Sequence, residues 1–227
     1  MRIVVSIPDP HDPEEARAVQ ASHARLVRTG MGFRNVAGVA LAYSPDESEA
    51  CVVASVLSTT NWKTVQEQRA VLPVSRPRDS EMQGFREGPL MLHVLERLAI
   101  EPDLILVLGD GVAHPRRFGL ACHVGVAIDH PTVGVSVLWP PGTRRPAVSF
   151  AGSLRRGTKT AMCHDPSGDI VGFALCTQDN QDPIYVSPGH RVSPEDAVAL
   201  ALRAAPWFRM PEPLRVAEMA ARSGTPR

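Results

Sequence analysis

Two short apolar runs enclose a turn and a helical segment in the middle of this chain, and this pattern constrains the fold more than any other. Leu104–Leu108 predicts a buried strand that ends abruptly in the glycine-flanked turn 109–111. Phe118–Ile128 has helical spacing, and Thr132–Val137 predicts a second strand. Strand, helix and strand form a right-handed βαβ unit. Asp110, in the turn, is therefore expected at the carboxyl end of a parallel strand, where ligand sites of open α/β sheets collect.

Three further strands are predicted upstream, at Val36–Tyr43, Cys51–Leu57 and Thr64–Leu72, joined by short polar turns. They form an antiparallel meander, and a meander followed by a βαβ unit is the order of a ribonuclease H-like fold. We expect an α/β protein with one domain over residues 1–227, a mixed sheet flanked by helices, and loose termini at 1–12 and 223–227.

The remaining elements follow from local signals. The predicted helices are Pro13 to about Arg28, which Gly30 and Gly32 end, then Arg86–Leu98, a helix capped by Ser193, and Pro211–Ala221. Further strands are predicted within Val148–Cys163, Asp169–Thr177 and Tyr185–Arg191.

Charge and cysteine usage limit the class of protein. The chain has 24 basic and 24 acidic side chains, so no global positive field favours tight binding to nucleic acid. Its four cysteines lack zinc-site spacing and are interpreted as reduced packing residues. No apolar run is long enough to span a membrane and no signal peptide is apparent, which predicts a cytoplasmic protein without a membrane partner. The oligomeric state is not predictable.

Several blocks of the sequence resemble one family. They are LILVLGDGVAHPRRFGLACHVGV, FREGP at 85–89, VAGVALAY at 36–43, YVSPGHRVS at 185–193 and PEPLRVAE at 211–218. In this order and spacing they resemble endonuclease V, from about residue 13 to residue 222. The resemblance implies a ribonuclease H-like sheet that carries a metal site built from carboxylates.

The chain departs from the family pattern at particular positions. Ala40 and Leu108 stand where the family has aspartates, and only the glutamate remains, as Glu87. Val137 stands where the family has a lysine, and the charged segment 78–81, Arg-Asp-Ser-Glu, replaces an apolar wedge that separates strands. We interpret these differences as the loss of the two-metal nuclease centre and of the wedge.

Two-metal cleavage of a phosphodiester needs several carboxylates. Asp110 lies two residues beyond Leu108 and would be displaced by about 6.6 Å along a strand, too far for a simple replacement. A weak single-metal site formed by Glu87, Asp110 and His190 is left as an alternative. No resident metal or cofactor is expected otherwise; Mg²⁺ or Mn²⁺ enters only with a nuclease function.

The family's base pocket is interpreted as retained. The candidate ligand-binding residues are Gly84, Gly88, Gly109, Gly111, Arg116 and His123, and the candidate catalytic residues are Glu87, Asp110, His114 and His190. Glu87 has an alternative role as an ordinary first-turn glutamate, and His123 as a packed core histidine. Arg144 and Arg145 either contact a phosphate or lie in a solvated loop.

These features lead to three functional hypotheses. The first is a metal-independent enzyme that applies acid and base chemistry to a small purine-like or other planar metabolite. The second is a protein that binds nucleic acid or purines without cleavage. The third is a weak metal-dependent endonuclease that cleaves near inosine in DNA or RNA. A steep salt dependence of binding would favour nucleic acid as the partner over a small molecule.

Overall fold

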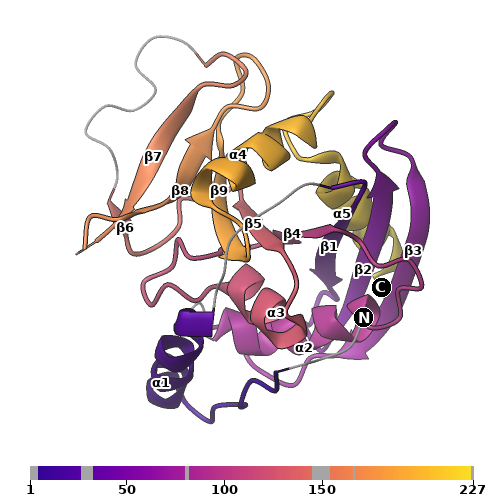
Figure 1. Cartoon of the computed structure of the whole chain (residues 1–227). Helices are drawn as coiled ribbons and strands as arrows, with labels where there is room; N and C mark the ends of the chain where they lie inside the picture. The colour runs from indigo at the N-terminus through magenta and orange to yellow at the C-terminus, as the bar shows by residue number, and fades with distance from the viewer. Residues whose placement is uncertain (1–4, 27–32, 80–81, 145–153, 166, 226–227) are drawn as a thin grey trace.

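One nine-stranded sheet carries the fold, in the order β3-β2-β1-β4-β5-β9-β8-β7-β6 (Figure 1). The computed structural model describes residues 5–26, 33–79, 82–144, 154–165 and 167–225. The strands are β1 (Asn35–Tyr43), β2 (Glu49–Ser58), β3 (Thr64–Pro73), β4 (Leu104–Leu108), β5 (Thr132–Ser136), β6 (Thr143–Arg144), β7 (Lys159–His164), β8 (Ile170–Leu175) and β9 (Ile184–His190). The antiparallel meander and the parallel unit β4-α3-β5 confirm the expected mixed α/β architecture.

Helices cover both faces of this sheet (Figure 1). They are α1 (Pro13–His23), α2 (Gln83–Leu95), α3 (Leu120–Ile128), α4 (Pro194–Arg203) and α5 (Glu212–Gly224), with a short 3₁₀ segment at Ala24–Leu26. Helices α2 and α3 pack on one face, and α4 and α5 pack on the other. None of these helices, within the described ranges, is long and apolar enough to cross a membrane.

The three parallel strands β1, β4 and β5 end at the same edge of the sheet. Val39 pairs with Val107, and Leu108 pairs with Val135. Strand β9 runs antiparallel to β5 and therefore ends at the opposite edge, where His190 pairs with Thr132. We call the first the loop edge, because residues 109–119 leave it toward α3, and the second the far edge.

Glycine permits a close contact between β1 and α5. A side chain at Gly38 would place its Cβ 2.1 Å from the carbonyl carbon of Pro213, at the start of α5. Only a residue without a Cβ lets the helix lie this close to the strand. The close packing of α5 on β1 therefore requires a glycine at position 38, in the centre of the block VAGVA.

Several boundaries differ from the sequence prediction. Helix α1 ends at His23 because the chain tightens into the 3₁₀ segment. Helix α2 begins at Gln83, three residues earlier than predicted, and Pro89 lies inside it. Its start is not recognisable in the sequence because the N-cap residue, Met82, has no side chain that could cap the helix. Helix α5 extends to Gly224, into a predicted loose terminus.

The C-terminal half also differs from the prediction. Strand β6 forms in a segment for which the sequence predicts a loop, and within the described residues 154–163 the predicted strand begins at Lys159, as β7. Other predictions fall outside the described residues: Arg28, Gly30, Gly32, Ser80, Glu81, Arg145 and Val148. All four cysteines are free.

Candidate functional site

Ala40 and Leu108 lie beside each other at the loop edge. Each is one residue beyond the paired Val39 and Val107 of the parallel strands β1 and β4. Both side chains face α5, where Ala40 is fully buried and Leu108 is partly buried in an apolar cluster with Cys51, Val53, Ala217 and Ala221. This face of the strand ends is filled by apolar packing and receives no oxygen ligand from these two residues.

Glu87 lies at the same edge but on the other face of the sheet, in α2. It is in the second turn of the helix and only 9% exposed, so its interpretation as a first-turn glutamate is wrong. The Tyr43 hydroxyl donates to Oε1 at 2.8 Å, and the Gln83 amide donates to Oε2 at 3.3 Å. Burial raises the pKa of the Glu87 carboxyl, and these two hydrogen bonds partly oppose the increase.

Arg86 extends this polar group and was missed by the sequence interpretation. Its guanidinium donates to Glu47 Oε2 at 2.7 Å and lies over the Tyr43 ring, 4.2 Å from the ring centroid. The side chain is 4% exposed, and its Nε has no hydrogen-bond partner among the described residues. The sequence held no clear signal for this role, because neither the burial of Arg86 nor its pairing with Glu47, 39 residues earlier, follows from local pattern.

Asp110 lies in the loop that follows β4. Its carbonyl accepts from the Ala121 amide at 2.9 Å and so secures the start of α3. No described residue hydrogen-bonds to its carboxyl group, which is partly buried. Burial raises the pKa of this carboxyl to about 7. Asp110 thus offers a carboxyl that titrates near neutral pH and has no intramolecular partner in the described chain.

The glycines around Asp110 let the loop turn sharply toward β9. Gly111 donates its amide to Ser187 Oγ at 2.8 Å, and a Cβ at Gly111 would meet the Pro188 carbonyl oxygen at 2.0 Å. Gly109 has a φ of +158° and donates to the Val135 carbonyl at 2.9 Å. These contacts fix the loop closely against the sheet.

His114 and Arg116 follow in the same loop, and both are involved in contacts within the protein. His114 is 7% exposed, and its Nδ1 accepts from the Arg116 amide at 3.3 Å. Burial and the nearby Arg116 lower the pKa of His114 to about 4, so the ring is neutral at pH 7. Arg116 Nε donates to the Gln20 side chain of α1. Catalytic and ligand-binding roles for these residues stay predictions.

His190 lies at the far edge, where it pairs with Thr132. Its Nε2 is 3.0 Å from Asp129 Oδ1, at the carboxyl end of α3, and the ring is 2% exposed. The site expected to combine His190 with Glu87 and Asp110 is therefore not assembled, because β9 runs antiparallel to β5 and carries His190 to the opposite edge.

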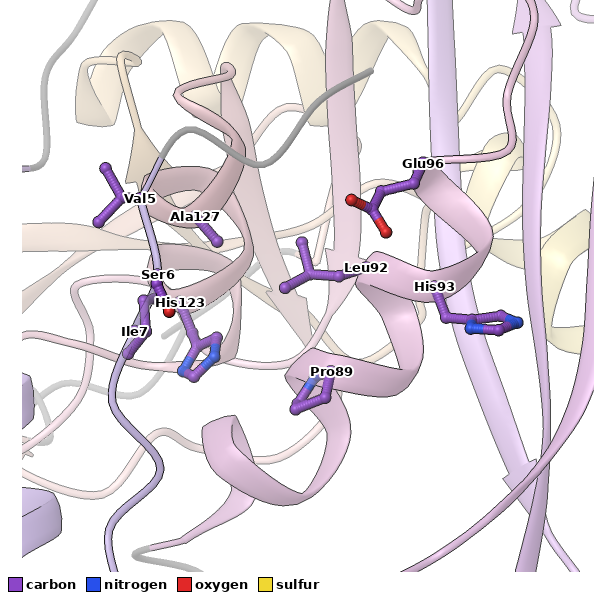
Figure 2. A pocket seen from close by; sticks show the side chains of 9 residues that line it. All are labelled: Val5, Ser6, Ile7, Pro89, Leu92, His93, Glu96, His123 and Ala127. Atoms are coloured by element: carbon purple, nitrogen blue, oxygen red, sulfur yellow. The ribbon is translucent and has the colours of Figure 1, made fainter.

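Gly84, Gly88 and His123 form a contact between α2 and α3. A Cβ at Gly88 would lie 2.6 Å from His123 Cδ2, so these glycines allow the ring to pack against α2. His123 is 4% exposed, lies edge-on to Phe85, and has its pKa lowered to about 4 by burial. Its ring borders a hollow of about 260 Å³, which neither Glu87 nor Asp110 lines. Figure 2 shows the ring beside this hollow with Ile7, Pro89 and Leu92. The ligand-binding role of Gly84, Gly88 and His123 stays a prediction.

A metal centre of the kind that the family resemblance implies needs several hard oxygen ligands in one place. Across the described ranges no group of three or more His, Cys, Asp and Glu side chains is placed to hold a metal ion. Glu87 has both carboxylate oxygens in hydrogen bonds, and Ala40 and Leu108 have no oxygen in their side chains. The described residues do not fit a two-metal centre as they stand.

Comparisons with known proteins identify the family. The family model described as Endonuclease V matches residues 16–219. Endonuclease V of Roseiflexus castenholzii is 38% identical over 220 residues, which cover 96% of this chain and 95% of that protein. The crystal structure of endonuclease V from Streptomyces avermitilis is 36% identical with a TM-score of 0.84, covering 96% of this chain and 95% of that one.

A more distant solved structure contains nucleic acid. Ciona intestinalis endonuclease V, in complex with a 24mer DNA containing an inosine followed by a ribo-adenosine, is 24% identical with a TM-score of 0.81. The match covers 92% of this chain and 96% of that one. At this level of identity the likeness concerns the fold.

The first functional hypothesis, a metal-independent enzyme for a small metabolite, is wrong. Relatives matched along nearly their whole length are nucleases by name, and the structures solved with a ligand contain inosine in DNA. The comparisons do not show the inferred loss of the active site and wedge either. Because the family model matches residues 16–219, most of its length, the chain belongs to the endonuclease V family.

Proposed function

We propose that this chain acts on nucleic acid that contains inosine, and that it recognises this base at the loop edge. The observation that carries the proposal is the family match over residues 16–219, which spans both helical layers and every strand of the sheet. Relatives with 34–39% identity share this length and the name endonuclease V.

The chemistry of Asp110 supports recognition of inosine. Hypoxanthine, the base of inosine, carries a proton on N1, whereas adenine has a lone pair there. A carboxylate accepts a hydrogen bond and cannot donate one, so Asp110 in its ionised form favours hypoxanthine over adenine. Its carboxyl group is partly buried, and no described residue hydrogen-bonds to it. The close packing of Gly109 and Gly111 against Leu120 and Pro188 holds the loop that carries it in place.

Hydrolysis of a neighbouring phosphodiester is the second part of the proposal, and it depends on Glu87. A buried carboxylate with a raised pKa at the edge of a sheet is a typical functional group. Because the described residues offer few oxygen ligands, we expect Mg²⁺ or Mn²⁺ to be needed at concentrations on the order of millimolar.

Binding is tested with end-labelled single-stranded DNA and RNA that carry inosine or adenosine at one position. We expect tighter binding of the inosine strands and an affinity that falls steeply with salt. Asp110→Asn should lower the preference for inosine, while Asp129→Asn, the same change at the far edge, should leave it unchanged. Equal affinity of the wild-type protein for the two bases would contradict the proposal.

Cleavage is tested on the same strands with Mg²⁺, with Mn²⁺ and with a chelator. We expect a metal-dependent nick close to inosine that is lost in Glu87→Gln and retained in Glu218→Gln, whose carboxylate lies on α5 and pairs with Arg222. Selective binding without a nick under any of these conditions would overturn the hydrolytic part and leave the recognition part standing.

A further inference from the structure

Val137 and Leu138 are exposed apolar residues at the loop edge. They directly follow β5, and 45% of Val137 and 75% of Leu138 are exposed. Single exposed apolar side chains are common on protein surfaces and need no explanation. The surroundings of Leu138, however, differ from those of an ordinary surface residue, because its backbone is held in place on both sides.

Ser136 fixes the backbone of Leu138. Its hydroxyl donates to the Leu138 carbonyl at 2.9 Å and accepts from the Leu138 amide at 3.2 Å. The next residues, Pro140 and Pro141, have their φ angles restricted by the ring. The Thr143 hydroxyl closes the turn by donating to the Pro140 carbonyl at 2.7 Å. We call residues 136–143 the Leu138 turn.

Trp139 attaches this turn to the loop that carries Asp110. Its side chain packs against the apolar cluster of Ala113, Met162 and Val171 and lies edge-on to Tyr185, with ring centroids 5.3 Å apart. Its indole nitrogen donates to the Thr143 carbonyl at 3.2 Å. The backbone of Leu138 is therefore held in a hydrogen-bonded turn, and this turn packs against the loop that carries Asp110.

A second contact fixes the far side of the turn. Gly142 has a φ of +77°, and a Cβ there would lie 2.6 Å from Pro115 Cα. The turn thus contacts the loop of residues 109–119 at two places, through the cluster that contains Ala113 and at Pro115. Two nearby cations pair with exposed carboxylates, Arg117 with Asp169 at 2.8 Å and Arg144 with Asp165 at 3.1 Å. Such surface pairs are weak, so both guanidinium groups are available to phosphates.

We propose that Leu138, supported by Val137, inserts between bases next to the inosine and opens the stack when the protein binds duplex nucleic acid. The inference rests on the proposed function. Insertion of an apolar side chain disrupts base stacking, and a residue on a fixed backbone meets this cost better than one on a mobile loop because the backbone loses less entropy on binding. Leu138 has the chemistry, the exposure and the rigid support for this role.

The test uses a duplex with inosine and an adjacent 2-aminopurine, whose fluorescence rises when it unstacks. The wild-type protein should raise this fluorescence on binding. Leu138→Ala should abolish most of the rise and weaken duplex binding about tenfold, a difference of about 1.4 kcal/mol. Binding to single-stranded inosine DNA, in which there is no duplex to open, should be unchanged. Leu138→Met, which keeps an apolar side chain of similar size, should restore the signal.

Val65→Ala is the matched control, since Val65 is a 47% exposed apolar residue at the opposite end of the sheet, in β3. It should behave as the wild type. An unchanged fluorescence rise and duplex affinity in Leu138→Ala, together with selective binding of single-stranded inosine DNA, would overturn the role of Leu138 alone. A wild-type protein that shows no selectivity on single strands would instead remove the proposed function on which this inference rests.

Discussion

The loop edge and the far edge of the sheet each hold an acidic residue at the end of an element, but the two residues have different surroundings. At the far edge, Asp129 pairs with His190 and with Arg191. At the loop edge, Asp110 supports α3 only through its carbonyl, and no described residue bonds to its carboxyl group. At the far edge, the acidic side chain is thus paired with other residues of the protein. The loop edge leaves a carboxyl available to a ligand, which is the common difference between a structural and a functional acid.

The two faces of the loop edge show the same contrast on a smaller scale. Toward α5, Ala40 and Leu108 lie in apolar packing, while toward α2, Glu87 is hydrogen-bonded to Tyr43. Polar chemistry at this edge is therefore concentrated on the α2 side and in the loop after β4.

The largest effect is expected from a change that breaks the loop edge itself. Gly111→Ala would place a Cβ 2.0 Å from the Pro188 carbonyl oxygen, a backbone atom that cannot move aside cheaply. We expect a loss of about 3 kcal/mol in the free energy of unfolding, measured by urea denaturation, together with the loss of inosine binding. Gly84→Ala is the control, because its Cβ would meet His123 at an ordinary 3.4 Å. Similar stability of the two variants would contradict the close packing of the loop.

The second prediction concerns the stability cost of the unpartnered Asp110 carboxyl. Its folded pKa of about 7 exceeds the ordinary 3.8, so the folded state binds more protons than the unfolded state between these pH values. Stability must then fall as pH rises from about 4 to about 7 and level off above. Asp110→Asn should match the wild type near pH 4 and be more stable by on the order of 2 kcal/mol at pH 8, allowing for partial solvation.

This prediction is checked by urea denaturation at both pH values. Asp129→Asn, at the far edge, should not show the same gain at pH 8, since its carboxylate is already paired. A stability difference between Asp110→Asn and the wild type that does not change with pH would refute the raised pKa.

The smallest effect is expected at the far edge. Asp129 has a φ of +50°, which both asparagine and glycine tolerate, so Asp129→Asn and Asp129→Gly keep the backbone. Asparagine retains an acceptor for His190, and glycine does not. We expect the glycine variant to be less stable than the asparagine variant by about 1 kcal/mol, with equal inosine binding. A change in inosine binding in either variant would mean that the two edges are coupled.

The sequence predicted the sheet well because its signals are local. The apolar runs, polar turns and glycine breaks specify where strands begin and end, and the family blocks fixed their order. The alternative role of His123 as a packed core residue likewise agrees with its burial between Phe85 and Phe118. Local patterns could not show which residues would meet.

Two examples show why the site was harder to predict. Whether His190 and Asp110 share an edge depends on the direction of β9, which the letters YVSPGHR do not encode. The place of Glu87 was misjudged because the predicted helix began at Arg86, which put Glu87 in its first turn, whereas α2 begins at Gln83 without a side-chain cap that would mark its start. Gln83, one partner of Glu87, lies a single helical turn away, but the other, Tyr43, lies 44 residues away and could be found only from the tertiary structure.

The pairing of β5 with β9 also has a consequence for how the chain folds during synthesis. Val135 pairs with Val186, which is synthesised about fifty residues later, so β5 and β9 cannot pair in the middle of the sheet before then. At typical translation rates this interval lasts roughly 3–10 seconds. Throughout it, one side of β5 has unpaired backbone groups, which are a template for wrong pairing. The late pairing of β5 with β9 should therefore make the nascent chain depend on chaperones until β9 has been synthesised.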